Sequence, residues 1–175
     1  MKKIVLLLLT LIVSGCSTMQ PPRYAVSVDN IQSLKSLDGS QLKAEGFTMS
    51  AEFKSGCRLM GPIEPADGLS IPAFISKAFN DELKMAEKYS ETGVKITGDV
   101  TKVAFKSTSG ANWEIAIKLM SSNGNSLETS NVYNFKSGFD AVTACNATAD
   151  ALSPAVQDLI QKIINHSGFP SLLKQ

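Results

Sequence analysis

Hydrophobic positions along the chain recur in places every second residue and in places every third or fourth, which predicts a mixture of strands and helices. The clearest helical pattern runs from Ile71 to Tyr89, with Ser70 as its cap and Pro72 in its first turn. Its apolar side chains share one half of the helical wheel, and most of its polar and charged side chains share the other. Glu82 breaks this pattern, because it lies in the middle of the apolar half.

A three-stranded meander is predicted after this helix. The apolar residues from Val94 to Val100 hold one alternating phase, whereas Val103 and Phe105 hold the other. One extra residue turns every later side chain to the opposite face, so we expect a β-bulge near Thr101-Lys102. The next two strands and the hairpin turn between them are Trp113 to Leu119, Asn123-Gly124 and Leu127 to Phe135, with Tyr133 and Phe135 facing inward.

Shorter elements are predicted on either side of these two regions. Before the helix we expect an extended segment at Tyr24 to Val28, a short helix capped by Asp29, and strands at Leu42 to Ala51 and Lys54 to Ile63. After the meander we expect a helix at Asp140 to Leu152, a restart at Ser153-Pro154, and a tail whose Leu172 and Leu173 return to the core. The whole pattern predicts a two-layer α+β sandwich, an antiparallel meander sheet packed by one mid-chain helix and a long C-terminal helix.

The first residues have the pattern of an export signal. Lys2 and Lys3 precede an apolar run from Ile4 to Val13 that would be only ~15 Å long as a helix, half of a ~30 Å bilayer core. The run ends in Val13-Ser14-Gly15-Cys16, which resembles a bacterial lipobox. The resemblance implies diacylglycerol on the sulfur of Cys16, cleavage before that residue and acylation of the new amine. The alternative is a cysteine that follows an ordinary leader by chance.

These features divide the chain into three parts. Residues 1–15 form the signal peptide, residues 16–23 the lipidated cysteine and a short tether, and residues 24–175 a single α+β domain. In the sorting rule of enterobacterial lipoproteins, an aspartate directly after the lipidated cysteine retains the protein in the inner membrane. Ser17 stands at that position, which implies a lipid-anchored protein of the outer membrane, on its periplasmic face.

Charge narrows the possible partners. Removing residues 1–15 leaves 15 basic residues against 16 acidic ones, a net charge near −1. Without a basic block, we expect no nucleic-acid partner and no polybasic membrane patch. The membrane is therefore expected as a partner through the acyl chains alone, beside a protein partner in the envelope.

Two cysteines remain after lipidation, Cys57 and Cys145. An even pair in an oxidising compartment predicts a disulfide, which would stabilise the fold by about 4–5 kcal/mol in the chain-entropy model. The alternative is a redox or metal pair, but a redox pair usually has C-x-x-C spacing and a metal site needs more ligands.

Catalytic chemistry is hard to find in this sequence. The single histidine, His166, is expected to interact with the carbonyls that end the last helix. We therefore expect no enzyme, no cofactor and no metal site. A carboxylate on an apolar face needs partners, so Glu82 is expected to pair with a group such as Arg58 or with backbone amides, unless the apolar stripe is narrower than the wheel implies. The alternative is that Glu82 lines a ligand cleft. Trp113 is either a core aromatic or an exposed binding residue.

Three stretches carry a resemblance to a family. AFISKAFNDELKMAEKYS, VKITGDVTKVAF and WEIAIKLMSSNGNSL resemble an uncharacterised family of small outer-membrane lipoproteins, with an EL-containing helix, an I-x-G-x-V strand, a G-centred hairpin and a closing helix. Similar architectures occur in auxiliary lipoproteins of envelope ABC transporters, in lipoprotein activators of peptidoglycan synthases and in the N-terminal domain of the Tol propeller protein. The resemblance implies an interaction module, and it carries over no specific residue.

Three hypotheses follow. The leading one is a lipid-anchored protein-interaction module for envelope assembly or maintenance, which an open sheet edge or an exposed apolar patch would favour. The second is a lipid- or small-ligand-binding auxiliary protein of an envelope transport system, which requires an apolar pocket between helices and sheet. The third is a hydrolase, which would lose activity on Glu82→Gln.

Overall fold

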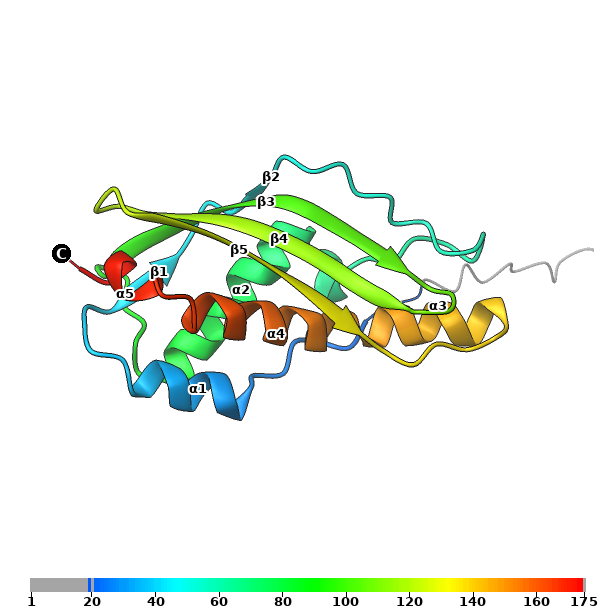
Figure 1. Cartoon of the computed structure of the whole chain (residues 1–175), viewed down its shortest axis with the longest axis horizontal. Helices are drawn as coiled ribbons and strands as arrows, with labels where there is room; N and C mark the ends of the chain where they lie inside the picture. The colour runs from blue at the N-terminus through cyan, green and yellow to red at the C-terminus, as the bar shows by residue number, and fades with distance from the viewer. Residues whose placement is uncertain (1–18, 20, 175) are drawn as a thin grey trace, which may run out of the picture.

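The computed structural model describes residues 19 and 21–174 and confirms the predicted two-layer α+β sandwich. Long, curved strands run along the length of the molecule, and helices α2 and α4 pack against one face of the sheet (Figure 1). The elements in chain order are α1 (Val28–Lys35), β1 (Leu42–Ala44), β2 (Thr48–Met49), a 3-10 helix (Ala66–Gly68), α2 (Ile71–Met85), β3 (Val94–Lys106), β4 (Asn112–Ser121), β5 (Ser126–Asn134), α3 (Ala141–Asp150), α4 (Leu152–Ile164) and α5 (Phe169–Leu172).

The sheet has the strand order β1-β3-β4-β5, and β2 pairs with β3 beside β1. Strands β3, β4 and β5 form the predicted antiparallel meander. The sheet also has a parallel part that the prediction did not include, because β1 and β2 both pair with β3 in parallel. The reason lies in the connection: α2 separates these short strands from β3, and a helical crossover returns the chain in the same direction.

The predicted bulge is present in β3. The pairing with β4 shifts register between Val100 and Lys102, so Val100 and Val103 are both buried on the helix-covered face. Ile115, Ile117 and Leu119 of β4 lie on the same face and are also buried. The bulge therefore keeps one apolar face along the whole of a 13-residue strand.

Helix caps explain several of the boundaries. The Ser70 hydroxyl accepts a hydrogen bond from Ala73 N–H at the start of α2, as predicted. Helix α1 begins one residue after Ser27, which is its cap, so the predicted cap Asp29 lies instead in the first turn. In the first turn, the Asp29 carboxylate interacts favourably with the positive end of the helix dipole. Helix α2 ends at Met85 rather than at Tyr89, because Glu87 adopts a positive φ of 60°.

The strand predicted at Lys54 to Ile63 is absent. Gly56 and Pro62 form an isolated bridge, and Met60 N–H donates to Cys57 O across a tight turn. Arg58 and Leu59 occupy the centre of this turn with φ of 45° and 62°, which ends any extended strand. Residues 56–62 therefore form a short turn-centred loop, not a strand of the sheet.

Candidate functional site

Glu82 is fully buried on α2, and its Oε1 is the centre of a hydrogen-bond cluster. The Tyr24 hydroxyl donates to it, the Ser27 N–H donates at 3.0 Å and the Asn30 amide donates at 3.2 Å. Burial and the neighbouring Glu82 raise the pKa of Tyr24 far above its usual range, so its hydroxyl stays a donor. Glu82 is thus hydrogen-bonded by the segment that enters α1, with a backbone amide among its partners as expected, and Arg58 is not one of them.

The Glu82 cluster has a structural role that can be traced to the chain around it. The amide of Asn30 also donates to Gln157 O at 3.0 Å, and the Gln157 amide donates to Ala25 O at 2.6 Å. Residues 24–30 are therefore held against both α2 and α4. Sequence reasoning found Glu82 but missed Tyr24 and Asn30, because 58 and 52 residues separate them from it in the chain.

Trp113 is a core aromatic, the first of its two predicted alternatives, and not an exposed binding residue. It is fully buried, and its ring N–H donates to Thr148 O of α3 at 2.8 Å. The rings of Phe105 and Phe53 pack beside it, with centroids 5.0 and 6.1 Å away. It faces inward because it continues the alternating series of Ile115 and Ile117 on β4.

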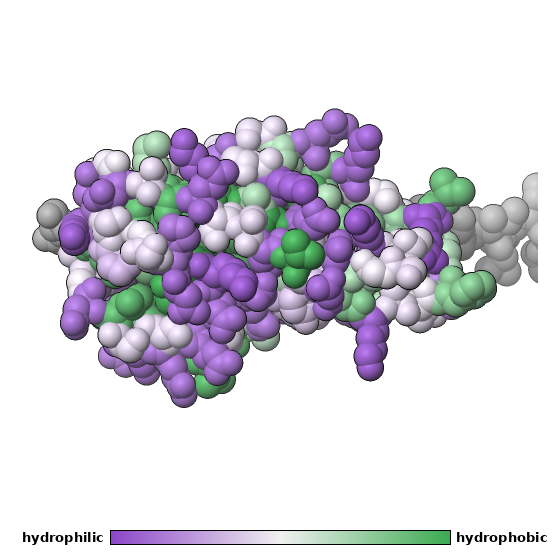
Figure 2. Space-filling model, viewed as in Figure 1, coloured by the Kyte–Doolittle hydropathy of each residue, from purple (hydrophilic) through white to green (hydrophobic). Residues whose placement is uncertain are grey.

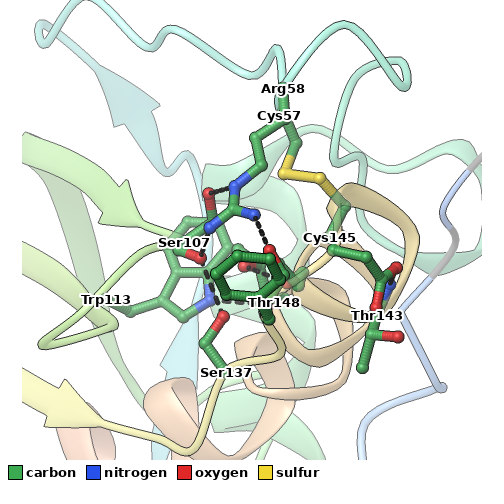
Figure 3. Close-up of a disulfide and its surroundings, with 11 residues drawn as sticks. Cys57, Arg58, Ser107, Trp113, Ser137, Thr143, Cys145 and Thr148 are labelled. Atoms are coloured by element: carbon green, nitrogen blue, oxygen red, sulfur yellow. Dashed lines mark hydrogen bonds between the residues drawn. A yellow bond between two sulfur atoms is a disulfide. The ribbon is translucent and has the colours of Figure 1, made fainter.

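Cys57 and Cys145 form the predicted disulfide, with Cα atoms 5.9 Å apart (Figure 3). The bond joins the loop of residues 56–62 to α3. Arg58 reinforces it: its guanidinium donates to Ser107 O at 2.5 Å, to the Ser107 hydroxyl at 3.2 Å and to Phe139 O at 3.1 Å. Three loops of the molecule are therefore fastened together at this end.

Three apolar side chains stand out on these fastened loops: Leu59 is 106% exposed, Phe139 103% and Val142 48%. We call them the apolar tip. Hydrophobic side chains project from the right-hand end of the molecule in the space-filling view (Figure 2). Neighbouring residues connect the three, because Arg58 binds Phe139 O and Val142 lies three residues before Cys145 on α3.

The start of the described chain lies beside the same loop. Met19 is buried and forms a parallel bridge with Ile63, directly after residues 56–62. Contacts with the domain thus begin inside the segment predicted as a tether. Cys16 and the predicted signal peptide lie outside the described residues, so their lipidation and cleavage stay predictions.

One edge of the sheet, strand β5, is open. This strand has nine residues and pairs only with β4 among the described residues. It contains neither proline nor lysine, and Glu128 is its one charged residue. Natural proteins usually protect such an edge with charges, prolines or very short strands. The other edge follows that rule, since β1 and β2 have three and two residues.

Apolar side chains from the helices and the sheet pack together in one core. An enclosed cavity of about 10 Å³ lies between Leu34, Leu42 and Phe169, which is room for about one water molecule. Binding sites for small molecules typically have volumes of ~300–1,000 Å³. The cavity beside Leu34 is therefore far too small for a lipid or another small ligand. Four hollows of about 400–590 Å³ reach that size, and they open widely onto the surface.

His166 also has a local role rather than a place in a site. Its Nδ1 accepts a hydrogen bond from Gly168 N–H at 3.0 Å, in the turn between α4 and α5. The expected interaction with helix carbonyls is thus replaced by one with a backbone amide. Within residues 19 and 21–174, no three His, Cys, Asp or Glu side chains gather in a way that could hold a metal ion. In the same residues, no helix has the length and hydrophobicity needed to span a bilayer.

Comparison with solved structures gives a distant likeness. No protein-family model and no curated protein matches the sequence. Among solved structures, the chain is similar to a Xanthomonas campestris protein of the family DUF330, with a TM-score of 0.47 and 15% identity, over 83% of this chain and 93% of that one. Function therefore has to be inferred from the surfaces of this chain itself.

Proposed function

We propose that this protein is a lipid-anchored, periplasm-facing interaction module that binds another protein during assembly or maintenance of the bacterial envelope. The acyl chains expected on Cys16 would hold it at the outer membrane. The open edge of β5 carries the proposal, because unpaired backbone groups of an edge strand are a ready template for a strand of another chain.

The composition of β5 fits strand addition. Its outward side chains Ser126, Glu128, Ser130, Val132 and Asn134 are all exposed. Small polar side chains leave room for an added strand, and backbone hydrogen bonds would supply much of the affinity. On its inner face, the Asn131 amide donates to Ala155 O at 2.8 Å and to Asp158 Oδ2 at 2.9 Å, which holds the edge in place on α4.

Carriage of a lipid or small ligand is the alternative, and the interior does not favour it. The cavity beside Leu34 holds only about 10 Å³, whereas a ligand carrier needs a pocket between helices and sheet. A hydrolase at Glu82 is favoured even less, because Glu82 is fully buried beneath the segment that contains Tyr24.

In-cell photocrosslinking tests the edge with a matched pair of positions. Glu128 of β5 and Lys118 of β4 are opposite each other in the register, and both are exposed. A photoreactive residue at position 128 should capture a specific envelope protein, whereas the same residue at position 118 should capture much less. Repeating the experiment with Cys16→Ala tests whether the lipid anchor is needed for binding. We expect the crosslinked complex only with the protein that keeps Cys16.

A second pair separates edge pairing from contact with the sheet face. Val132 on β5 is 57% exposed and Met120 on β4 is 51% exposed. Val132→Lys should reduce capture because lysine on an edge strand opposes strand addition, and Met120→Lys should leave it intact. Equal capture from positions 128 and 118, or equal loss in both lysine variants, would contradict a role for the edge. Recovery of lipid alone would favour ligand carriage.

A further inference from the structure

The apolar tip differs from ordinary exposed hydrophobic residues, which are scattered singly over protein surfaces. Leu59 and Phe139 are completely exposed, and they belong to loops joined through the Arg58 guanidinium. The disulfide between Cys57 and Cys145 adds Val142 and the first turns of α3 to the same end. Three apolar side chains are thus presented together by a fastened part of the fold.

The backbone holds Leu59 outward at a cost in conformational energy. Arg58 and Leu59 both have positive φ, the pattern of a type I′ turn that normally contains asparagine or glycine. A left-handed conformation is unfavourable for a residue with a β-carbon. Asparagine at position 59 would lower that cost, so the apolar side chain there is not explained by the turn.

The chain start places the expected anchor at this end. Met19 bridges Ile63, which follows the loop that carries Leu59. Cys16 precedes Met19 by three residues in the sequence, and three residues of chain span at most ~11 Å. Acyl chains on Cys16 would therefore enter a bilayer close to the apolar tip.

We propose that the apolar tip inserts into the interfacial layer of the same membrane that holds the acyl chains, so that the domain is fixed at both points. The proposal rests on the lipid anchor of the proposed function. Attachment through Cys16 raises the local concentration of the tip at the bilayer, so a weak apolar contact is sufficient. Apolar side chains at an interface reach ~5–10 Å into the boundary between headgroups and acyl chains.

The test uses the full-length, processed and acylated protein in vesicles of phosphatidylethanolamine and phosphatidylglycerol whose acyl chains are brominated. Phe139→Trp reports on the tip, and Val132→Trp reports on the exposed face of β5 as a matched control. Trp113 is fully buried, so its emission in the unaltered protein gives the baseline. We expect Phe139→Trp to lose about half of its added emission, because an inserted ring reaches the brominated carbons. Val132→Trp should lose almost none.

Each outcome distinguishes the tip from the anchor. Flotation of the protein with vesicles but equal emission with and without bromine would overturn the tip and leave the anchor intact. Failure to float would contradict the lipid anchor, and the tip proposal would fall with it. A photoreactive residue at position 139 that captures a protein in cells, rather than lipid, would assign the tip to a protein partner and overturn the proposal as well.

Discussion

The two ends of the molecule differ in whether their apolar side chains are buried. At the end that carries the C-terminus, Phe169, Leu172 and Leu173 are buried, so the chain closes its own core (Figure 1). At the end that carries α3, Leu59 and Phe139 are fully exposed. Both ends consist of loops and short or terminal helices, so the kind of secondary structure does not explain the difference.

Polar clamps fasten both ends to a similar degree. The Asn123 amide donates to Ser171 O at 3.1 Å and to Leu172 O at 3.3 Å, and it holds α5 against the β4–β5 turn. Arg58 does the same at the other end through Ser107 O and Phe139 O. Exposure of the apolar tip is therefore not a sign of loose structure. Order and burial are therefore separate properties in this molecule.

Two phenylalanines give the largest expected contrast between the ends. Phe169→Ala should lower the free energy of unfolding by ~3–5 kcal/mol, because it removes a fully buried ring and leaves a cavity. Phe139→Ala should change it by less than ~0.5 kcal/mol, as is usual for surface positions. Urea unfolding of both variants measures the difference. A loss of comparable size at position 139 would mean that its side chain is buried in solution.

Loss of the disulfide should have the next largest effect. The sequence separation of Cys57 and Cys145 is 88 residues, and removing a disulfide of this kind costs about 2–5 kcal/mol. Cys57→Ala combined with Cys145→Ala should therefore unfold at lower urea, and the unaltered protein under a reducing agent should shift by a similar amount. An unchanged midpoint in both experiments would show that the bond does not stabilise this fold.

The two polar clamps should have intermediate and similar effects. Arg58→Ala removes the hydrogen bonds to Ser107 O and Phe139 O, although the Ser137 hydroxyl still donates to Ser107 O. Asn123→Ala removes those to Ser171 O and Leu172 O, which keep donors from Asn125 and Ser121. Each lost hydrogen bond should cost about 0.5–1.5 kcal/mol. Proteolysis should then distinguish them by position, with new cleavage near residue 107 or 139 for the first and near residue 171 for the second. Cleavage at the same sites in both variants would indicate general unfolding instead of local opening.

The smallest expected effect has the opposite sign. Leu59→Asn should raise the free energy of unfolding by up to ~1 kcal/mol, because asparagine tolerates a positive φ better than leucine. Phe139→Asn is the control, since position 139 does not have a positive φ and should gain nothing. If the apolar tip contacts lipid, both variants should also bind vesicles more weakly. A destabilised Leu59→Asn would show that leucine makes contacts in the fold.

Local signals in the sequence predicted much of this fold. Ser70 and Pro72 located the start of α2, and the change of phase between Val100 and Val103 located the bulge, because caps and side-chain alternation depend on near neighbours. The parallel pairing of β1 and β2 was missed. Strands of two or three residues carry too little pattern to show their direction.

The candidate surfaces were harder to predict than the elements. The pattern from Lys54 to Ile63 indicated a strand, but Arg58 and Leu59 adopt positive φ in a loop whose partners, Ser107 and Cys145, are distant in sequence. Trp113 could have been either buried or exposed until the position of Thr148 was known. The open edge of β5 also depends on strand order, which alternation within one strand does not reveal.

The length of strand β3 would set how far the domain extends from a membrane. The strand runs along the length of the domain without interruption, and 13 residues at ~3.3 Å each span ~43 Å. With the apolar tip on a bilayer, β3 would act as a rigid spacer that holds the β4–β5 turn roughly that far above the lipid surface. The edge of β5 would then stand along the membrane normal, within reach of a partner anywhere in that layer of the periplasm.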